Sequence, residues 1–161
     1  MSKTRRKARS DARLPAPPWY AEGLRFECTA CGRCCVNHGD GYEYVFSTRD
    51  ERKALAAHFG LSLEAFERRY CERIDGVGLS FKSRDGGCIF LAGQRCSVYG
   101  LRPKQCRTFP FWPELLESED SWQRDVASFC PGVGQGPLHD LNAIRAALQR
   151  ETEQRDTEPA P

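Results

Sequence analysis

The sequence predicts a small, irregular α+β domain in which short strands and short helices surround a group of cysteines. The chain has 161 residues, a length typical of one domain with additional tails. Its strand-like and helix-like runs are all short, and glycine or proline separates them. Nine of the residues are cysteines. We therefore expect a metal-organised domain, in which a bound metal supplements a modest apolar core.

Composition divides the chain into four segments. Residues 1–18 are basic and end in prolines, so we expect a disordered tail. The cysteine-cluster domain is expected over residues 19–136. A C-terminal helix is predicted for residues 137–150, and the polar residues 151–161 should form a second disordered tail.

The first half of the domain contains a loop, a strand and two helices. Residues 24–35 are predicted to form a cysteine-rich loop, and the aromatic and β-branched residues 42–46 a short strand. Ser47 or Thr48 can cap a helix, because an acidic residue follows three positions later in each case. Gly60 should end that helix, and Ser62 should cap a second one.

The second half begins with short strands. Three are predicted, at residues 79–82, 88–91 and 95–99, and a turn at Ala92-Gly93 joins the last two. Pro103 suits the first turn of a helix, which Pro110 should end early.

The glycine-rich residues 131–137 are predicted to be a linker. The linker should lead into the C-terminal helix, whose apolar residues recur at helical spacing. These residues are Leu138, Leu141, Ile144, Ala147 and Leu148.

The charge distribution limits the kinds of molecule that the chain is expected to bind. Residues 1–14 carry six basic side chains against Asp11 alone, which gives +5, so the rest of the chain carries −3 within a total of +2. This balance argues against a nucleic-acid-binding domain, although the basic tail could bind nucleic acid weakly. No apolar run is long enough to span a membrane, and none forms a secretory signal. We therefore expect a cytoplasmic protein with reduced cysteines and no membrane partner.

The spacing Cys28-x-x-Cys31-x-x-Cys34-Cys35 is the strongest motif in the chain. A two-residue gap lets both thiolates of a pair face one metal centre. Three such cysteines in series are typical of iron–sulfur sites, in which each thiolate binds a different iron. Cys130-Pro131 is similar to the cysteine–proline pair of bacterial ferredoxins, although it lies far downstream of the run. An iron–sulfur cluster, preferably [4Fe–4S], is the first prediction, and Zn²⁺ is the alternative.

Further cysteines downstream can complete the ligand set. They are Cys88, Cys96, Cys106 and Cys130. With the first four they give eight ligands, enough for two four-thiolate sites or for one cluster with the remaining cysteines in a redox or catalytic role. Cys34 and Cys35 should point to opposite sides of an extended backbone. Cys71 is predicted to be an ordinary thiol, and His38 is a possible replacement ligand.

At these residues the chain resembles the YkgJ-type cysteine-cluster (CxxCxxCC) family, often described as zinc- or iron-chelating. The matching motifs span roughly residues 24–136 and occur in the expected order. They are Phe26-x-Cys28-x-x-Cys31-Gly32-x-Cys34-Cys35, Cys88-Ile89-Phe90-Leu91, Cys96-Ser97-Val98-Tyr99, Arg102-Pro103-x-x-Cys106-Arg107-x-Phe109-Pro110 and Cys130-Pro131-Gly132. The resemblance implies a metal or iron–sulfur centre and leaves the activity open.

Three classes of function follow. The first is a metal-binding module. The second is an iron–sulfur enzyme, either redox-active or similar to the flagellin lysine methylases, which use S-adenosylmethionine. The third is a structural zinc module that binds an unidentified protein partner through its basic N-terminal tail. Arg102 and Arg107 flank Cys106 and are candidates to bind an anionic substrate or to offset the charge of a thiolate-ligated cofactor. The neighbouring residues 109–112 should form an apolar wall around the metal.

Overall fold

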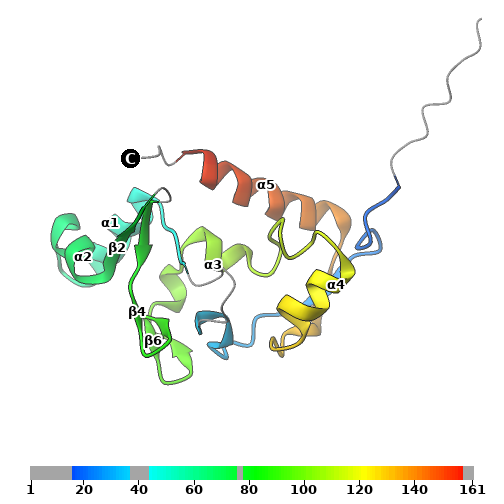
Figure 1. The fold of residues 1–161 in the computed structure, drawn as a ribbon, viewed down its shortest axis with the longest axis horizontal. Helices are drawn as coiled ribbons and strands as arrows, with labels where there is room; N and C mark the ends of the chain where they lie inside the picture. The colour runs from blue at the N-terminus through cyan, green and yellow to red at the C-terminus, as the bar shows by residue number, and fades with distance from the viewer. Residues whose placement is uncertain (1–15, 37–43, 76–77, 158–161) are drawn as a thin grey trace, which may run out of the picture.

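The computed structural model describes residues 16–36, 44–75 and 78–157, with side chains up to residue 150. Its helices and short antiparallel strands form a mixed α+β domain, which confirms the predicted fold class (Figure 1). The helices are α1 (Arg49–His58), α2 (Leu63–Tyr70), α3 (Lys104–Thr108), α4 (Glu119–Trp122) and α5 (Leu141–Thr157), with the 3-10 helices η1 (Arg33–Cys35) and η2 (Tyr99–Leu101) and the single π-turn η3 (Gln123–Ala127).

The strands form four separate antiparallel pairs. They are β1 (Leu24–Phe26) with β8 (Val133–His139), β2 (Cys71–Ile74) with β3 (Gly78–Phe81), β4 (Ser83–Arg84) with β5 (Gly87–Cys88), and β6 (Leu91–Ala92) with β7 (Arg95–Cys96). Because each pair is short, the sheets link segments of the chain without forming an extended layer.

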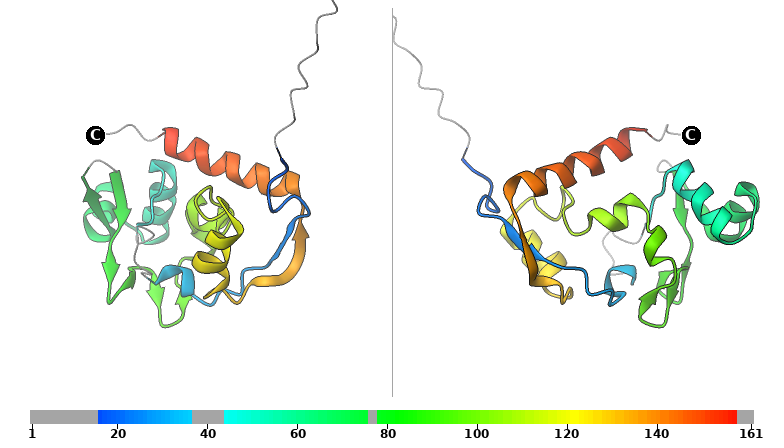
Figure 2. Two further views of the ribbon diagram at one scale, coloured as in Figure 1. Left: turned by 45° about the vertical axis from the view of Figure 1, so that its right-hand side comes forward. Right: turned by 180° about the vertical axis from the view of Figure 1, so that it is seen from behind.

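Two hydrophobic cores support these elements. The first core joins β1, α4 and α5 through Phe26, Phe111, Leu115, Leu116, Trp122, Val126, Ile144 and Ala147. The second core joins α1, α2 and β3 through Leu55, Ala56, Phe66, Cys71, Phe81, Phe90 and Val98. Figures 1 and 2 show α1 and α2 at one end of the molecule and α4 at the other, with α3 between them and α5 along one side.

The predicted helix caps are confirmed. Thr48 forms a capping box with Glu51 at the start of α1, and Ser62 accepts a hydrogen bond from the backbone N–H of Ala65 at the start of α2. Gly60 follows α1 with a φ of +65°, a conformation that glycine adopts without strain. Pro103 precedes α3 as expected.

Several predicted elements differ from the structure. The predicted linker 131–137 is wrong, because β8 covers most of it and pairs with β1. Gly134 and Gly136 have positive φ, so the strand is irregular and its pattern resembles a loop. The C-terminal helix begins at Leu141 and continues beyond the predicted end to Thr157, while Leu138 belongs to β8 and is exposed.

The predicted strands are also shorter than expected. Within the described part of residues 42–46, only Phe46 makes a bridge, to Ser80. The predicted strands 88–91 and 95–99 become parts of two small hairpins, β4–β5 and β6–β7. In the part of the chain that the structure describes, no helix is both long enough and apolar enough to cross a membrane.

Candidate metal centre

Eight of the nine cysteines line one pocket of about 70 Å³, to which residues of both cores contribute. Four come from the loop after β1, two from the hairpin strands β5 and β7, one from α3 and one from the turn before β8. They are Cys28, Cys31, Cys34, Cys35, Cys88, Cys96, Cys106 and Cys130. These are the eight metal-ligand candidates of the sequence analysis. Cys71 instead lies buried in the second core.

The cysteine loop packs closely on the hairpin β6–β7. Gly32 has a φ of +71°, and a Cβ atom at this position would lie 2.5 Å from the backbone oxygen of Gln94. The Cys35 N–H donates to the Gly32 carbonyl (2.9 Å), which closes the turn that carries η1. Glycine is therefore required here both for its backbone conformation and for the close approach. Figure 2 shows η1, in blue, beside this hairpin.

Further backbone contacts bring distant cysteines to the loop. Val36 forms an antiparallel bridge with Gly87, the neighbour of Cys88. At the other end of the loop, the Glu27 N–H donates to the Gly132 carbonyl (3.1 Å), two residues after Cys130. The backbone itself therefore places Cys88 and Cys130 near opposite ends of the cysteine loop.

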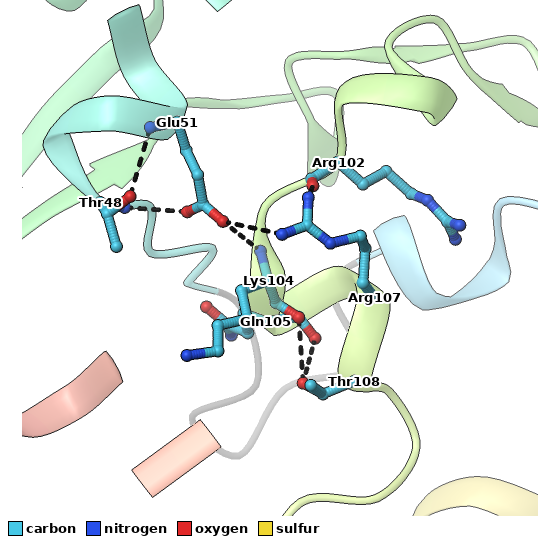
Figure 3. A network of polar contacts seen from close by, with 7 residues as sticks. All are labelled: Thr48, Glu51, Arg102, Lys104, Gln105, Arg107 and Thr108. Atoms are coloured by element: carbon cyan, nitrogen blue, oxygen red, sulfur yellow. Dashed lines mark hydrogen bonds and ion pairs between the residues drawn. The ribbon is translucent and has the colours of Figure 1, made fainter. Parts of the chain in front are cut away.

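Helix α3 presents Cys106, and polar side chains fix the position of the helix. Gln105 accepts a hydrogen bond from the Phe46 N–H (2.7 Å) and donates to the Tyr44 carbonyl (3.0 Å). Glu51 of α1 accepts from the Lys104 N–H (2.6 Å) at the start of α3 (Figure 3). Sequence reasoning missed both residues, because the pattern around Glu51 indicates only its capping of α1.

Hydrogen bonds between thiols shift the pKa values inside the pocket. The hydrogen bond with Cys35 lowers the pKa of Cys34 to about 7 and that of Cys96 to about 6, and the charge of Arg102 acts in the same direction. The same two hydrogen bonds raise the pKa of Cys35. Since the thiolate is the form that binds metal, Cys34 and Cys96 are poised as ligands near neutral pH.

Burial has the opposite effect on other thiols. It raises the pKa of Cys88 to about 11 and raises the pKa values of Cys106 and Cys130. A bound cation would reverse this preference, because a coordinating thiol loses its proton to the metal. Burial also raises the pKa of Cys71 to about 11, in a site away from the pocket.

The donor set fits a thiolate-bound metal in its chemistry, because eight cysteines line the same pocket. Among the described residues, no three cysteine, histidine, aspartate or glutamate side chains already converge as an ion site. All nine cysteines are free thiols, so eight soft donors remain available around the same pocket. Metal ligation therefore requires rotation of cysteine side chains and local adjustment of the loop.

The two candidate arginines have different surroundings. Arg102 lines the pocket and donates from Nη1 to the Cys28 sulfur (3.7 Å), while its guanidinium lies 3.6 Å from the centre of the Tyr99 ring. Arg107 instead contacts Glu51 (3.4 Å) and donates to the Arg102 carbonyl (Figure 3). Tyr99, which the sequence analysis did not single out, thus helps to hold Arg102 beside Cys28.

The expected apolar wall lies only partly in the pocket. Phe109 and Trp112 line the pocket, while Phe111 is buried in the first core. His38 lies outside the described residues. His139 is not part of the pocket: its Nε2 atom is 2.9 Å from the Phe26 carbonyl, and its ring packs on Phe111.

Comparison with known proteins now identifies the family. The model of the CxxCxxCC family, described as "Putative zinc- or iron-chelating domain", matches residues 27–131. The chain belongs to the CxxCxxCC family. The match contains all eight cysteines of the pocket.

This member of the CxxCxxCC family is also similar to the uncharacterized protein MJ0661 of Methanocaldococcus jannaschii. The two are 24% identical over 127 residues, which cover 75% of this chain and 66% of the relative. This chain thus matches slightly less than two thirds of the relative's length. No solved structure matches the chain.

Proposed function

We propose that this member of the CxxCxxCC family is a metal-binding module that holds an iron–sulfur cluster through cysteine thiolates. One observation carries the proposal: the eight cysteines brought together around the pocket are those that the motif spacing selects, and Cys71 lies apart. The family description, zinc- or iron-chelating, supports the coarser assignment to metal binding. A bound cluster would supply one-electron chemistry or metal-dependent sensing.

The residues of the chain would bind and shield this cofactor. The thiols of the cysteine loop would supply ligands spaced for different irons. Phe109 and Trp112 would exclude water from one side, and Arg102 would offset part of the negative charge of the thiolates. The free thiols also support a reducing location such as the cytoplasm.

Zinc is the second candidate, because the family description covers zinc as well as iron. Four thiolates also form a usual closed site of structural zinc. Both candidates use four thiolates per centre, and eight cysteines can satisfy either one. The complete ligand supply favours a closed, non-catalytic centre over an enzyme with an open coordination position.

The deciding experiment is anaerobic purification followed by visible spectroscopy and by analysis of iron, zinc and acid-labile sulfide. A brown protein with iron and sulfide is expected. A colourless protein with stoichiometric zinc would replace the iron–sulfur assignment by the zinc one. A protein with neither metal would contradict the proposed function. Calorimetric titration of the metal-loaded protein with S-adenosylmethionine should give no heat of binding. Saturable binding would instead favour the hypothesis that the protein is a methyltransferase.

A further inference from the structure

We propose that the eight thiols form two adjacent four-thiolate centres, with Cys34 and Cys35 at the boundary between them. The first centre comprises Cys28, Cys31, Cys34 and Cys130, and the second comprises Cys35, Cys88, Cys96 and Cys106. This inference rests on the proposed function, because it assumes metal binding by the pocket. It specifies how the cysteines divide, which neither the motif spacing nor the family description determines.

Contacts at the start of the loop define the first centre. Strand β1 leads directly into Cys28, and β8 begins three residues after Cys130. Pairing of these strands and the Glu27–Gly132 hydrogen bond (3.1 Å) hold Cys130 beside the start of the loop. The thiols that act electrostatically on Cys130 are Cys31, Cys34 and Cys28, the three from the CxxCxxC run.

Contacts at the end of the loop define the second centre. The Val36–Gly87 bridge holds Cys35 near Cys88, and a hydrogen bond joins Cys35 to Cys96. Cys88 and Cys96 also lie near each other. The Ser97 N–H, next to Cys96, donates to the carbonyl of Phe90, two residues after Cys88 (2.8 Å). The thiols that act electrostatically on Cys106 are Cys34, Cys88 and Cys96, so two of the three belong to this set and the third is the neighbouring Cys34.

The geometry of η1 separates the two centres. Cys34 and Cys35 occupy consecutive positions of a 3-10 helix, where successive side chains point about 120° apart. One turn of chain can therefore direct a thiol to each side once metal is bound. In the metal-free pocket the Cys34 and Cys35 thiols are hydrogen-bonded to each other, and ligation of separate centres breaks this bond. The CxxC spacing assigns Cys34 to Cys31, and Cys35 then completes the second set of four.

Metal counting with cobalt tests the division. Co²⁺ is added anaerobically to the metal-free full chain, and the equivalents bound per chain are read from the thiolate–cobalt absorption and from elemental analysis. The wild type should bind two equivalents. A Cys31→Ser/Cys130→Ser variant and a Cys88→Ser/Cys106→Ser variant should each retain one, because each change damages a single centre. Cys71→Ala, the control, should retain two.

A variant that damages both proposed centres provides the decisive comparison. Cys31→Ser/Cys88→Ser changes as many ligands as the other double variants, yet it should lose both tight equivalents. A wild type that binds one equivalent would overturn the division while leaving the proposed function intact. The division would also fail if this variant kept one tight equivalent. Absence of any tight binding by the wild type would contradict both proposals.

Discussion

At the residue scale, Arg102 and Arg107 belong to the same sequence motif but contact different parts of the molecule. Both flank Cys106 in the sequence, but Arg102 follows η2 whereas Arg107 lies in α3, and their guanidinium groups reach different partners. Arg102 contacts Cys28. Arg107 instead contacts Glu51 (Figure 3). Sequence reasoning could nominate both arginines from their charge. It could not distinguish them, because the difference depends on contacts with residues more than 50 positions away.

We expect Arg102→Gln to weaken metal binding by about tenfold, a typical effect of losing a group that contacts a metal ligand. The substitution removes the positive charge beside the Cys28 sulfur. Competition for Zn²⁺ against a chromophoric chelator measures the affinity. Arg107→Gln is the matched control and should change the affinity much less. Equal losses in the two variants would contradict a specific role for Arg102.

A pair of glycines tests the close packing of the cysteine loop. Gly32 and Gly93 both have positive φ, so alanine at either position is strained by about 1–2 kcal/mol. Only at Gly32 would the new Cβ also overlap backbone, that of Gln94, because the space around Gly93 is open. We expect Gly32→Ala to cost more unfolding free energy than Gly93→Ala and to weaken metal binding. Denaturant unfolding and Zn²⁺ competition measure the two effects, and equal behaviour of the variants would rule out this packing constraint.

At the element scale, one carboxylate joins two helices. Glu51 accepts from the Thr48 N–H (2.9 Å) within the capping box of α1 and from the Lys104 N–H (2.6 Å) at the start of α3. The second contact joins α3, the helix that carries Cys106, to α1, which belongs to the second core. The capping box was predictable, because its two residues are three positions apart. The link to α3 was not, because 53 residues separate its ends.

We expect Glu51→Ala to lower the free energy of unfolding by about 1–3 kcal/mol, because two backbone donors and Arg107 lose a largely buried acceptor. Asp50→Ala is the control, since the Asp50 side chain is 89% exposed and should change stability by less than about 0.5 kcal/mol. Denaturant midpoints at constant metal loading measure both effects. A Glu51→Ala variant as stable as Asp50→Ala would show that the link between the helices contributes little.

The accuracy of the sequence prediction varied with the range of the interactions. Helices α1 and α2 were predictable because their caps and apolar faces lie within a few residues. Strand β8 was mistaken for a linker because its partner, β1, lies more than 100 residues earlier. The short hairpins around Cys88 and Cys96 were read as longer strands, because tertiary packing rather than β-propensity ends them. Local spacing was sufficient to nominate the eight pocket cysteines, but it did not indicate how they divide.

At the scale of the whole molecule, the cysteine pocket lies between two separate cores. Phe26, Phe109 and Trp112 contribute to it from the first core, and Phe81, Phe90 and Val98 from the second. A metal held there would therefore contribute a further connection between the two hydrophobic clusters. The three tryptophans of the chain all pack in the first core, so their fluorescence reports on that half.

We expect metal removal to lower the thermal stability and to separate the unfolding of the two cores. In the metal-loaded protein, tryptophan fluorescence and far-ultraviolet circular dichroism should show one coincident transition. After chelation the two signals should no longer coincide, because α1 and α2 belong to the core without tryptophan. Coincident transitions in both states would show that the cores are coupled without the metal.

The position of Cys130 also has a consequence for biosynthesis. Cys28 to Cys35 are translated early, and Cys130 is added 95 residues after Cys35. At about 5–20 residues per second, this interval lasts roughly 5–20 s on the ribosome. Cys88, Cys96 and Cys106 are added within this interval, but Cys28, Cys31 and Cys34 lack Cys130 until its end. In the proposed division, a metal captured by these three thiols before then would lack its fourth ligand, and the site would be completed only when the turn that precedes β8 has emerged.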